Sequence, residues 1–220
     1  MSVEYGKETS ARRGRRDDAR TVAGAHRPMR RADREVMEPE DIAAIVDGCD
    51  IVDVAYADAE GLTMVPLNFG YEYDHDGGRL VLWMHSAAHG RKIDAIRAAG
   101  DRLPVAFSMR TDCEIVAGRT ACGWGESFKS IVGEGVASIV DDLDARRRGL
   151  QLLMAHQAHM PHVEFTDAQV RSVTVWRIES ERLTAKVRPK PAAAHGGHGK
   201  HGDAAADSVA GDNAAGGTTV

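Results

Sequence analysis

The 220-residue sequence predicts a mostly β protein with short helices, in which antiparallel strands form a closed or partly closed barrel. Several segments alternate apolar and polar residues with a period of two, and turns rich in Gly and Asp separate them. The few helical segments are short and do not alternate with strands as the βαβ units of a parallel sheet do. Five to seven strands, joined mostly by turns, therefore favour an antiparallel barrel with one hydrophobic core.

The first expected element is a helix that begins near Pro39 and ends at Gly48. Proline is favoured in the first turn of a helix, and the acidic residues that follow complement the positive end of the helix dipole. Apolar residues then recur at the spacing i, i+3, i+4, i+7, which predicts one buried face: Ile42, Ile45, Val46 and Cys49.

Three strands in antiparallel succession are expected next. Residues 52–56 alternate apolar and polar side chains, residues 58–61 form a turn, and residues 62–69 complete a β-hairpin. The Asp- and Gly-rich residues 74–78 predict a second turn, and the apolar residues 79–85 predict the third strand.

The second half of the chain predicts two more helices and the remaining strands. A short helix at 90–99 places Ile93 and Ile96 inward. Asp141 is suited to cap a longer helix that carries four apolar residues, Leu143, Leu150, Leu153 and Met154. The strands are expected at residues 103–109, 128–140, 173–178 and 183–187.

The two ends of the chain differ in composition from the region between them. Residues 1–28 contain almost no large apolar side chains, so we expect a disordered leader that cannot offset the entropy of ordering. Met29 is then a candidate start of translation. Residues 189–220 are rich in Ala, Gly and His, and we expect a disordered tail there. Residues 29–188 form a single domain on this interpretation.

Charge, cysteine content and hydropathy narrow the possible function classes. A net charge of −5 gives no overall field that favours nucleic acid, so any anion site must be local. Three cysteines without CxxC spacing predict neither a disulfide framework nor a cysteine zinc site. No apolar run is long enough for a membrane helix, and no apolar segment of a signal peptide follows the N-terminal arginines. We therefore expect a cytoplasmic protein without membrane or nucleic-acid partners.

Residues 83–92 carry the most informative motif, in which a strand end, a hydroxyl, a glycine and two adjacent cations meet at a helix start. A helix N-terminus presents unpaired N–H groups, Arg91 is suited to grip a phosphate with two hydrogen bonds, and Lys92 adds a point charge. Ser86 supplies one more donor. The alternative is that Arg91 and Lys92 are merely solvated first-turn residues, which is the commoner role of an isolated pair.

Residues 64–72, Met-Val-Pro-Leu-Asn-Phe-Gly-Tyr-Glu, and residues 82–92 change this balance, because they resemble the pyridoxamine 5'-phosphate oxidase-like superfamily. The nitroimidazole-resistance branch is the most similar part of it. The resemblance extends over residues 29–188 and includes 127–135, Ser-Phe-Lys-Ser-Ile-Val-Gly-Glu-Gly, and 175–186. It implies a split β-barrel that binds flavin mononucleotide (FMN), usually as a homodimer with the flavin in a cleft at the subunit interface.

The resemblance also assigns roles to individual residues, which fall into four groups. They are Val65, Pro66, Leu67 and Asn68 along the flavin ring; His85 and Ser86 beside the ribityl chain and phosphate; Arg91 and Lys92 at the phosphate; and Lys129 and Ser130 opposite. The sequence has no segment near its C-terminus like the Arg-Leu-His-Asp-Arg motif of the true pyridoxamine phosphate oxidases. Oxidation of vitamin B6 is therefore not expected.

His85 is the candidate catalytic residue, because it ends an apolar strand next to the expected cofactor and histidine titrates near neutral pH. Alternatively, it only hydrogen-bonds the cofactor or a neighbouring backbone group. The resulting hypothesis is an FMN-dependent oxidoreductase that reduces a small substrate, such as a nitro-aromatic compound or another small oxidant. Two alternatives stay open: a non-catalytic protein that binds flavin or haem and uses His85 as a ligand, and a deazaflavin-dependent reductase.

Histidines recur every three residues in two places, but no metal site is expected at either. Pro161 breaks the predicted helix before His162 can align with His156 and His159, so we expect these three histidines to be exposed. The glycine-rich tail offers no preorganised metal geometry to its own set, His195, His198 and His201.

Two further patterns have both a functional and a structural interpretation. Gly133 and Gly135 resemble a fragment of a dinucleotide-binding motif, but no complete GxGxxG precedes a helix, so a Rossmann site is not expected. Trp124 and Trp176 are able to stack on a flavin, although tryptophan in a small barrel more often fills the core or a dimer interface.

Overall fold

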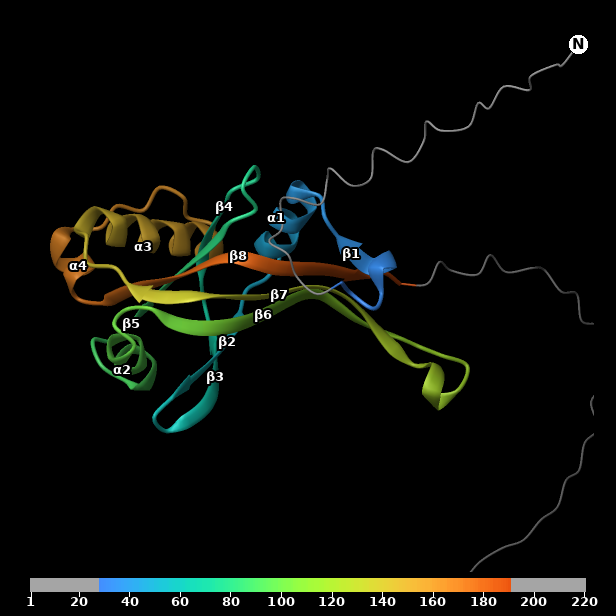
Figure 1. The fold of residues 1–220 in the computed structure, drawn as a ribbon. Coiled ribbons are helices and arrows are strands. Elements are labelled where there is room, and N and C mark those ends of the chain that lie inside the picture. The colour runs from blue at the N-terminus through green and yellow to red at the C-terminus, as the bar shows by residue number, and fades with distance from the viewer. Residues whose placement is uncertain (1–27, 191–220) are drawn as a thin grey trace, which may run out of the picture. The chain divides into compact units, whose positions relative to one another are not determined.

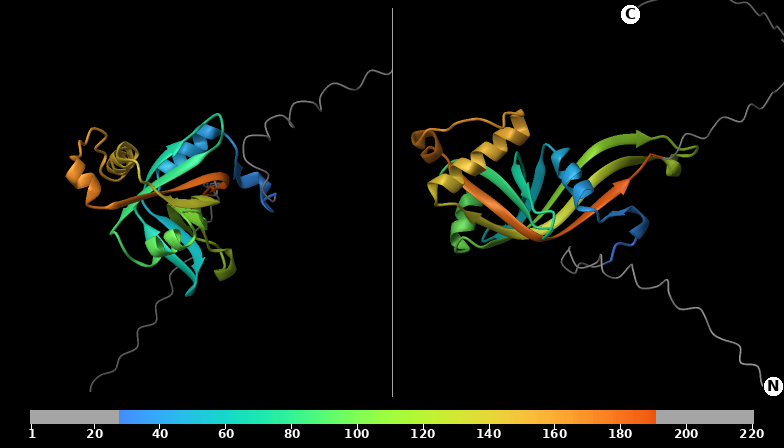
Figure 2. Two further views of the ribbon diagram at one scale, coloured as in Figure 1. Left: turned by 60° about the vertical axis from the view of Figure 1, so that its left-hand side comes forward. Right: turned by 90° about the horizontal axis from the view of Figure 1, so that it is seen from above.

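Eight strands form one sheet in the computed structural model, which describes residues 28–190 (Figure 1). Their hydrogen-bonded order is β3-β2-β6-β7-β8-β5-β4, with β1 paired to β8, and each pair is antiparallel. The sheet curves strongly around a core (Figure 2). Its two edge strands, β3 and β4, follow each other directly in the chain. The prediction of a mostly β, partly closed antiparallel barrel is confirmed.

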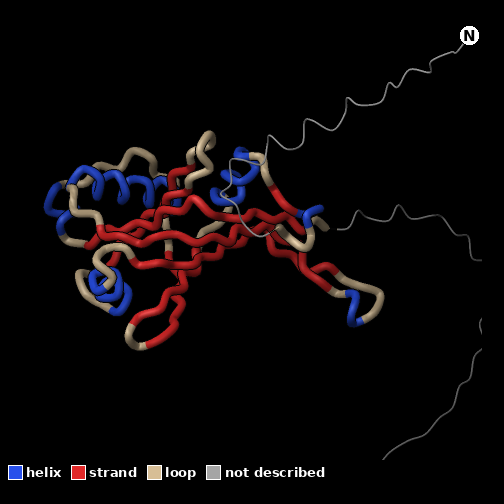
Figure 3. The backbone as a smooth tube through the Cα atoms, in the orientation of Figure 1, coloured by secondary structure: helices blue, strands red, loops and turns tan. Residues whose placement is uncertain are grey.

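Strands make up the body of the domain and helices lie at its margins (Figure 3). In chain order the elements are η2 Ala32–Arg34, β1 Glu35–Val36, α1 Pro39–Asp47, β2 Val52–Asp58, β3 Gly61–Leu67, β4 Gly70–Tyr73, β5 Leu80–Ser86, α2 Arg91–Ala98, β6 Leu103–Val116, η3 Ala121–Gly123, β7 Gly125–Ile139, α3 Leu143–Ala158, α4 Asp167–Arg171 and β8 Thr174–Arg188. Every helix within residues 28–190 is too short or too polar to cross a membrane. The expected leader and tail lie outside the described residues, apart from their innermost positions.

The first helix and the first hairpin agree with the prediction. α1 begins at Pro39, has Gly48 as its C-cap, and buries the apolar face that the spacing indicated. β2 and β3 pair in the expected hairpin, with Val54 opposite Val65. The inward positions of β2 alternate with partly exposed ones, as a period of two requires.

The succession of three antiparallel strands is wrong in one respect. The segment expected as a single strand at 62–69 divides at Asn68 and Phe69 into β3 and the start of β4. These two strands lie at opposite edges of the sheet, so β5 pairs with β4 and β8 and not with β3. The division follows from packing, because Phe69 is fully buried and β4 lies against α3.

The second half contains longer strands than predicted. β6 and β7 continue past the barrel as a hairpin that carries η3 near its tip and projects away from the body (Figure 1). The two expected C-terminal strands are one continuous strand, β8. α3 is capped by Asp142, whose side chain accepts a hydrogen bond from Ala145 N, and not by Asp141.

Two groups of buried side chains hold these elements together. The main core fills the inside of the curved sheet and includes the inner faces of α1 and α2. A second group lies under α3 and α4, on the other face of β5 and β8, and contains Trp83, Val170 and Val175. β5 is therefore buried on both faces up to Met84, and becomes accessible only at its last two residues, His85 and Ser86.

Candidate functional site

A cavity of about 620 Å³ lies where β5 ends and α2 begins. The β2–β3 hairpin forms one wall, and the turn that precedes β8 forms another. We call it the β5–α2 pocket. Its lining residues are Tyr56, Thr63, Val65, His85, Ser86, Ala87, His89, Gly90, Arg91, Lys92, Ser172 and Val173. The motif found in the sequence at 83–92 therefore opens onto a real cavity.

The structure brings only some of the predicted site residues together. Those that line the β5–α2 pocket are Val65, His85, Ser86, Arg91 and Lys92. Pro66, Leu67 and Asn68 continue the chain beyond Val65 but do not line the pocket, and neither do Lys129 and Ser130 on β7. The predicted phosphate-binding residues are therefore assembled within one chain. The predicted residues on β7, and those that follow Val65, lie outside this cavity.

Ser86 is oriented by a tryptophan from the neighbouring strand. The deeply buried Trp176 donates a hydrogen bond from Nε1 to Ser86 Oγ over 3.1 Å. Since an indole only donates, the Ser86 hydroxyl acts as acceptor here and keeps its own proton for another partner. His85, the adjacent residue, has an exposed side chain without a hydrogen bond in the described part of the chain.

The start of α2 contributes backbone donors to the pocket. Gly90, the N-cap, has φ of 131°, a conformation that favours glycine, and it offers no side chain to cap the helix. Asp94 Oδ2 accepts from Gly90 N over 3.3 Å, while the next N–H groups begin the helix. The first-turn N–H groups and the positive end of the helix dipole together favour an anion at this place.

Arg91 is held by a carboxylate that the sequence analysis assigned only to a turn. Asp58 Oδ2 and Oδ1 accept from Arg91 Nε and Nη2, both over 2.8 Å, and Nη2 also donates to the Gly61 carbonyl over 3.0 Å. The hydrogen bond raises the pKa of Arg91 and lowers that of Asp58. Arg91 is thus fixed in place and its charge is largely compensated, while its Nη1 protons keep no partner within residues 28–190.

Lys92, unlike Arg91, has no carboxylate partner among the described residues. Its side chain is half-buried, lines the pocket, and forms no ion pair with any of the described residues. An unpaired ammonium in a partly buried place attracts an anion more strongly than an exposed one, because water and salt screen it less. Lys92 is therefore the uncompensated cation of the β5–α2 pocket.

Replacing Asp58 by Asn is expected to lower the thermal midpoint of unfolding near neutral pH, because the pair with Arg91 is lost. The pKa of Asp58 is lowered in the folded state, so the pair stabilises the fold above the ordinary carboxyl pKa of about 3.9. That contribution disappears as the pH falls through the lowered value. The midpoint difference between wild type and Asp58→Asn should therefore shrink at acid pH. Asp76→Asn, at an exposed carboxylate without an ion pair among the described residues, serves as control.

The predicted residues outside the pocket have other partners. The Asn68 amide donates to Gln157 Oε1 of α3 over 2.7 Å, which fixes the junction between β3 and β4. Lys129 Nζ pairs with Asp112 Oδ2 at 2.8 Å. Ser130 lies in register between Arg110 of β6 and Lys186 of β8, on the outer face of the sheet. In a single chain these residues do not reach the β5–α2 pocket.

The three histidines at 156, 159 and 162 differ in their exposure. His156 is not exposed as expected: it packs against Phe69 and Tyr71, and its Nε2 lies 2.9 Å from the Cys49 carbonyl. His159 and His162 are exposed, and no group of metal-binding side chains exists within residues 28–190. The tail histidines at 195, 198 and 201 lie outside the described residues.

The two tryptophans differ in their surroundings, and Gly133 has a packing role. Trp176 belongs to the core, whereas Trp124 is exposed near the tip of the projecting hairpin. Gly133 packs against the ring of Phe107, so the absence of a side chain there serves the barrel interior.

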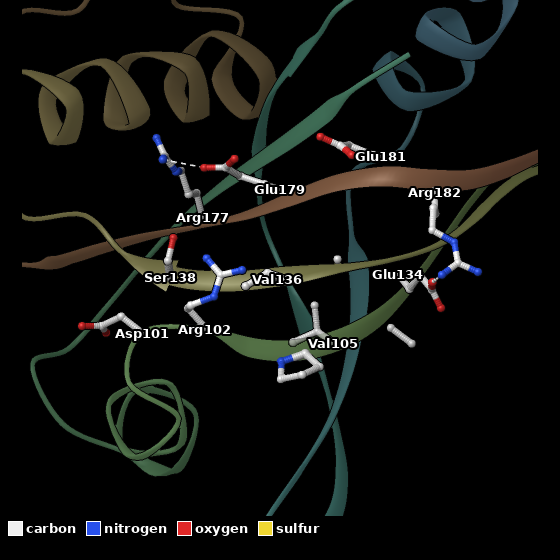
Figure 4. A pocket seen from close by; sticks show the side chains of 13 residues that line it. Asp101, Arg102, Val105, Glu134, Val136, Ser138, Arg177, Glu179, Glu181 and Arg182 are labelled. Atoms are coloured by element: carbon white, nitrogen blue, oxygen red, sulfur yellow. Dashed lines mark ion pairs between the residues drawn. The ribbon is translucent and has the colours of Figure 1, made fainter. Parts of the chain in front are cut away.

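A larger groove of about 780 Å³ lies on the outer face of β6, β7 and β8 and contains none of the predicted site residues (Figure 4). Arginines and carboxylates line it together, and several of them pair with each other, as Arg177 does with Glu179 and Arg182 with Glu134. Because these charges compensate one another, the groove is a weaker anion site than the β5–α2 pocket.

Several residues of the site were not among the predicted site residues, including Tyr56 and Thr63, which line the pocket, and Asp58, which holds Arg91. Tyr56 was recognised as part of an alternating strand, and its alternation already placed it inward. What the sequence could not show is that β2 ends at the mouth of a cavity. Asp58 was assigned to a turn, and only the fold brings it to Arg91, 33 residues away.

Comparison with known proteins identifies relatives of this arrangement. A sequence model described as pyridoxamine 5'-phosphate oxidase matches residues 38–187. A candidate 5-nitroimidazole antibiotic resistance protein from Bacteroides thetaiotaomicron has 26% identity and a TM-score of 0.57, over 70% of this chain and 86% of that one. No protein of curated function matches the chain significantly in sequence.

Two more distant structures share the fold. The flavocytochrome Anf3 from Azotobacter vinelandii has 17% identity and a TM-score of 0.60, over 74% of this chain and 73% of that one. The FAD and haem binding protein from Mycobacterium smegmatis has 18% identity and a TM-score of 0.59, over 73% and 77%. At 17% and 18% identity, the similarity of these two structures shows a common fold and no more.

Proposed function

The chain belongs to the pyridoxamine 5'-phosphate oxidase family, and on this premise we propose that it is a cytoplasmic flavoprotein that holds FMN in the β5–α2 pocket. The observation that carries the proposal is the convergence of an uncompensated cation, a free hydroxyl proton and a helix N-terminus on one cavity. These belong to Lys92, Ser86 and α2. All three are groups that bind phosphate oxygens.

The donors present fit a phosphate group. Lys92 supplies an ammonium, Arg91 has two Nη1 protons left after pairing with Asp58, and Ser86 has its hydroxyl proton. A phosphate accepts several hydrogen bonds at once, so it satisfies donors from β5 and α2 together. The negative charge of Asp58 stays paired with Arg91 and does not face the ligand alone.

Beyond the phosphate, the flavin ring would lie along β3, from Val65 towards Asn68, with His85 at the opposite wall. The ring supplies hydride or electron transfer when bound, and the protein supplies binding, orientation and exclusion of water. His85 is free to hydrogen-bond the cofactor or a small substrate, because none of the described residues occupies its ring nitrogens. We propose that a nitro-aromatic compound or another small oxidant is the electron acceptor.

A second candidate function follows from the same histidine. An exposed imidazole at a cavity mouth is a suitable axial ligand for haem, and the two distant structures are described as a flavocytochrome and as a FAD and haem binding protein. The chain would then bind its cofactor without catalysing a reaction. The phosphate donors beside His85 favour a phosphorylated flavin instead, FMN or a deazaflavin.

We further propose a homodimer that completes the flavin site. The outer face of the sheet carries exposed apolar side chains on β3 and β7, with Leu62 82%, Met64 65% and Val132 52% exposed. Lys129 and Ser130 lie at the other end of these strands, so a second copy is needed to bring them to the pocket. We propose a two-fold contact of this face with itself, which would supply these residues to both pockets. Light scattering should give the mass of two chains, and a single-chain mass for the flavin-loaded protein would contradict the dimer.

The cofactor proposal is tested on protein purified without added cofactor. We expect a yellow protein with the two visible bands of an oxidised flavin, and mass spectrometry of the released chromophore should identify FMN. A single Soret band would support haem instead, and a deazaflavin mass would keep the fold and change the electron donor. If added FMN also fails to bind, the flavoprotein proposal is wrong.

A further inference from the structure

Tyr56 is the last buried residue of β2 and lies at the β5–α2 pocket. The residue lines the cavity although it is only 4% exposed. In the β2–β3 hairpin it lies directly opposite Thr63, which also lines the pocket. Residues directly opposite each other in a hairpin project from the same face of the sheet, so both hydroxyl-bearing side chains belong to one wall.

The Tyr56 hydroxyl has no hydrogen-bond partner among residues 28–190. Its oxygen is not among the fully buried unpaired side-chain atoms of these residues, so the hydroxyl is accessible. Tyr71, a tyrosine away from the pocket, shows the usual arrangement, in which its hydroxyl donates to Asp47 Oδ1 over 3.1 Å. Tyr56 is thus a mostly buried side chain whose unpaired hydroxyl is open to the cavity and available to a ligand there.

The surroundings of Tyr56 keep its hydroxyl protonated. Burial raises its pKa, and this effect outweighs the opposite influence of the nearby Arg91 charge. The group is therefore a neutral hydrogen-bond donor at physiological pH, close to the guanidinium that faces the proposed phosphate site. A donor in this position suits an anionic acceptor.

We propose that the Tyr56 hydroxyl donates a hydrogen bond to the phosphate of the ligand that the β5–α2 pocket binds. This proposal rests on the proposed function and adds to it a contact from β2, so the phosphate is held from β2, β5 and α2 together. The neighbouring Thr63 hydroxyl, which also has no partner among the described residues, lies on the same wall.

The test compares Tyr56→Phe with Tyr71→Phe, which remove the same atom from two tyrosines of one sheet. Tyr56→Phe should weaken FMN binding by about tenfold or more, because a hydrogen bond to a charged group is lost. It should leave riboflavin affinity unchanged, since riboflavin lacks the phosphate. The thermal midpoint of its ligand-free form should stay equal or rise, because no protein contact is lost. Tyr71→Phe should lower that midpoint and leave FMN affinity unchanged.

The outcomes separate this inference from the function on which it rests. If the wild type binds FMN and Tyr56→Phe binds it equally well, or if riboflavin affinity falls in parallel, the Tyr56 contact is wrong and the flavin site stands. If the ligand-free Tyr56→Phe protein loses stability as Tyr71→Phe does, the hydroxyl has a structural role instead. If the wild type binds neither FMN nor riboflavin, the proposed function itself fails.

Discussion

Replacing Arg91 and Lys92 together by Ala is expected to weaken FMN binding by about two to four powers of ten. Each charge-assisted hydrogen bond to the phosphate contributes roughly 1.5–3 kcal/mol, and each 1.4 kcal/mol changes the dissociation constant about tenfold. The barrel should stay folded, because both side chains belong to the first turn of α2 and neither is part of the core. Titration of the cofactor-free protein with FMN, followed by flavin fluorescence, measures the effect.

The two single variants should differ. Arg91 shares its charge with Asp58, and Glu60 lies 4.0 Å from its Nε, whereas Lys92 has no such compensation in the described part of the chain. We therefore expect Lys92→Ala to account for the larger part of the lost affinity. Arg91→Ala should in addition lower stability, since Asp58 then loses the partner that lowers its pKa.

A matched control removes two cations elsewhere. Arg148 and Lys190 form surface ion pairs with Glu72 and Glu114, away from the β5–α2 pocket. The double variant Arg148→Ala, Lys190→Ala has the same net charge as the test variant, so it corrects for the overall field. Equal FMN affinity in wild type and in Arg91→Ala, Lys92→Ala would show that the phosphate binds elsewhere.

The parts of the fold that could be predicted depend on local signals. α1 was predictable because a proline, two acidic residues and one apolar face lie within ten residues of each other. The β2–β3 hairpin was predictable because its turn and its alternation are contiguous in the chain. The motif at residues 83–92 was recognisable for the same reason, because Ser86, Arg91 and Lys92 are separated by only a few residues.

The parts that could not be predicted depend on distant partners. β5 pairs with β8, about 90 residues later, and nothing in either strand specifies that choice over β3. His156 was expected to be exposed because a helix pattern alone does not show what packs on it. Phe69 and Tyr71 cover its ring only because β4 lies against α3. Asp58 and Tyr56 became site residues for the same reason, since the hairpin that carries them meets the start of α2.

α3 packs against β4, the strand at one edge of the sheet. This close contact requires a glycine at position 70. Gly70→Ala is expected to destabilise the fold by about 3 kcal/mol or more. A Cβ at this position would lie 2.7 Å from Leu153 Cα and closer still to Leu153 N and the Leu152 carbonyl carbon. These are backbone atoms of α3, which cannot rotate away as a side chain can, so the whole helix must shift.

A shift of α3 would also break the hydrogen bonds that tie it to the start of β4. Gln157 donates to the Phe69 carbonyl over 3.1 Å, and Asn68 donates to Gln157. Urea unfolding should show a lower midpoint with an unchanged slope. Gly123→Ala is the matched control, since the nearest atom to its added Cβ is 3.4 Å away and its φ is not positive. If both variants unfold at the wild-type midpoint, α3 does not pack on β4 as the structure has it, and the division between β3 and β4 needs another cause.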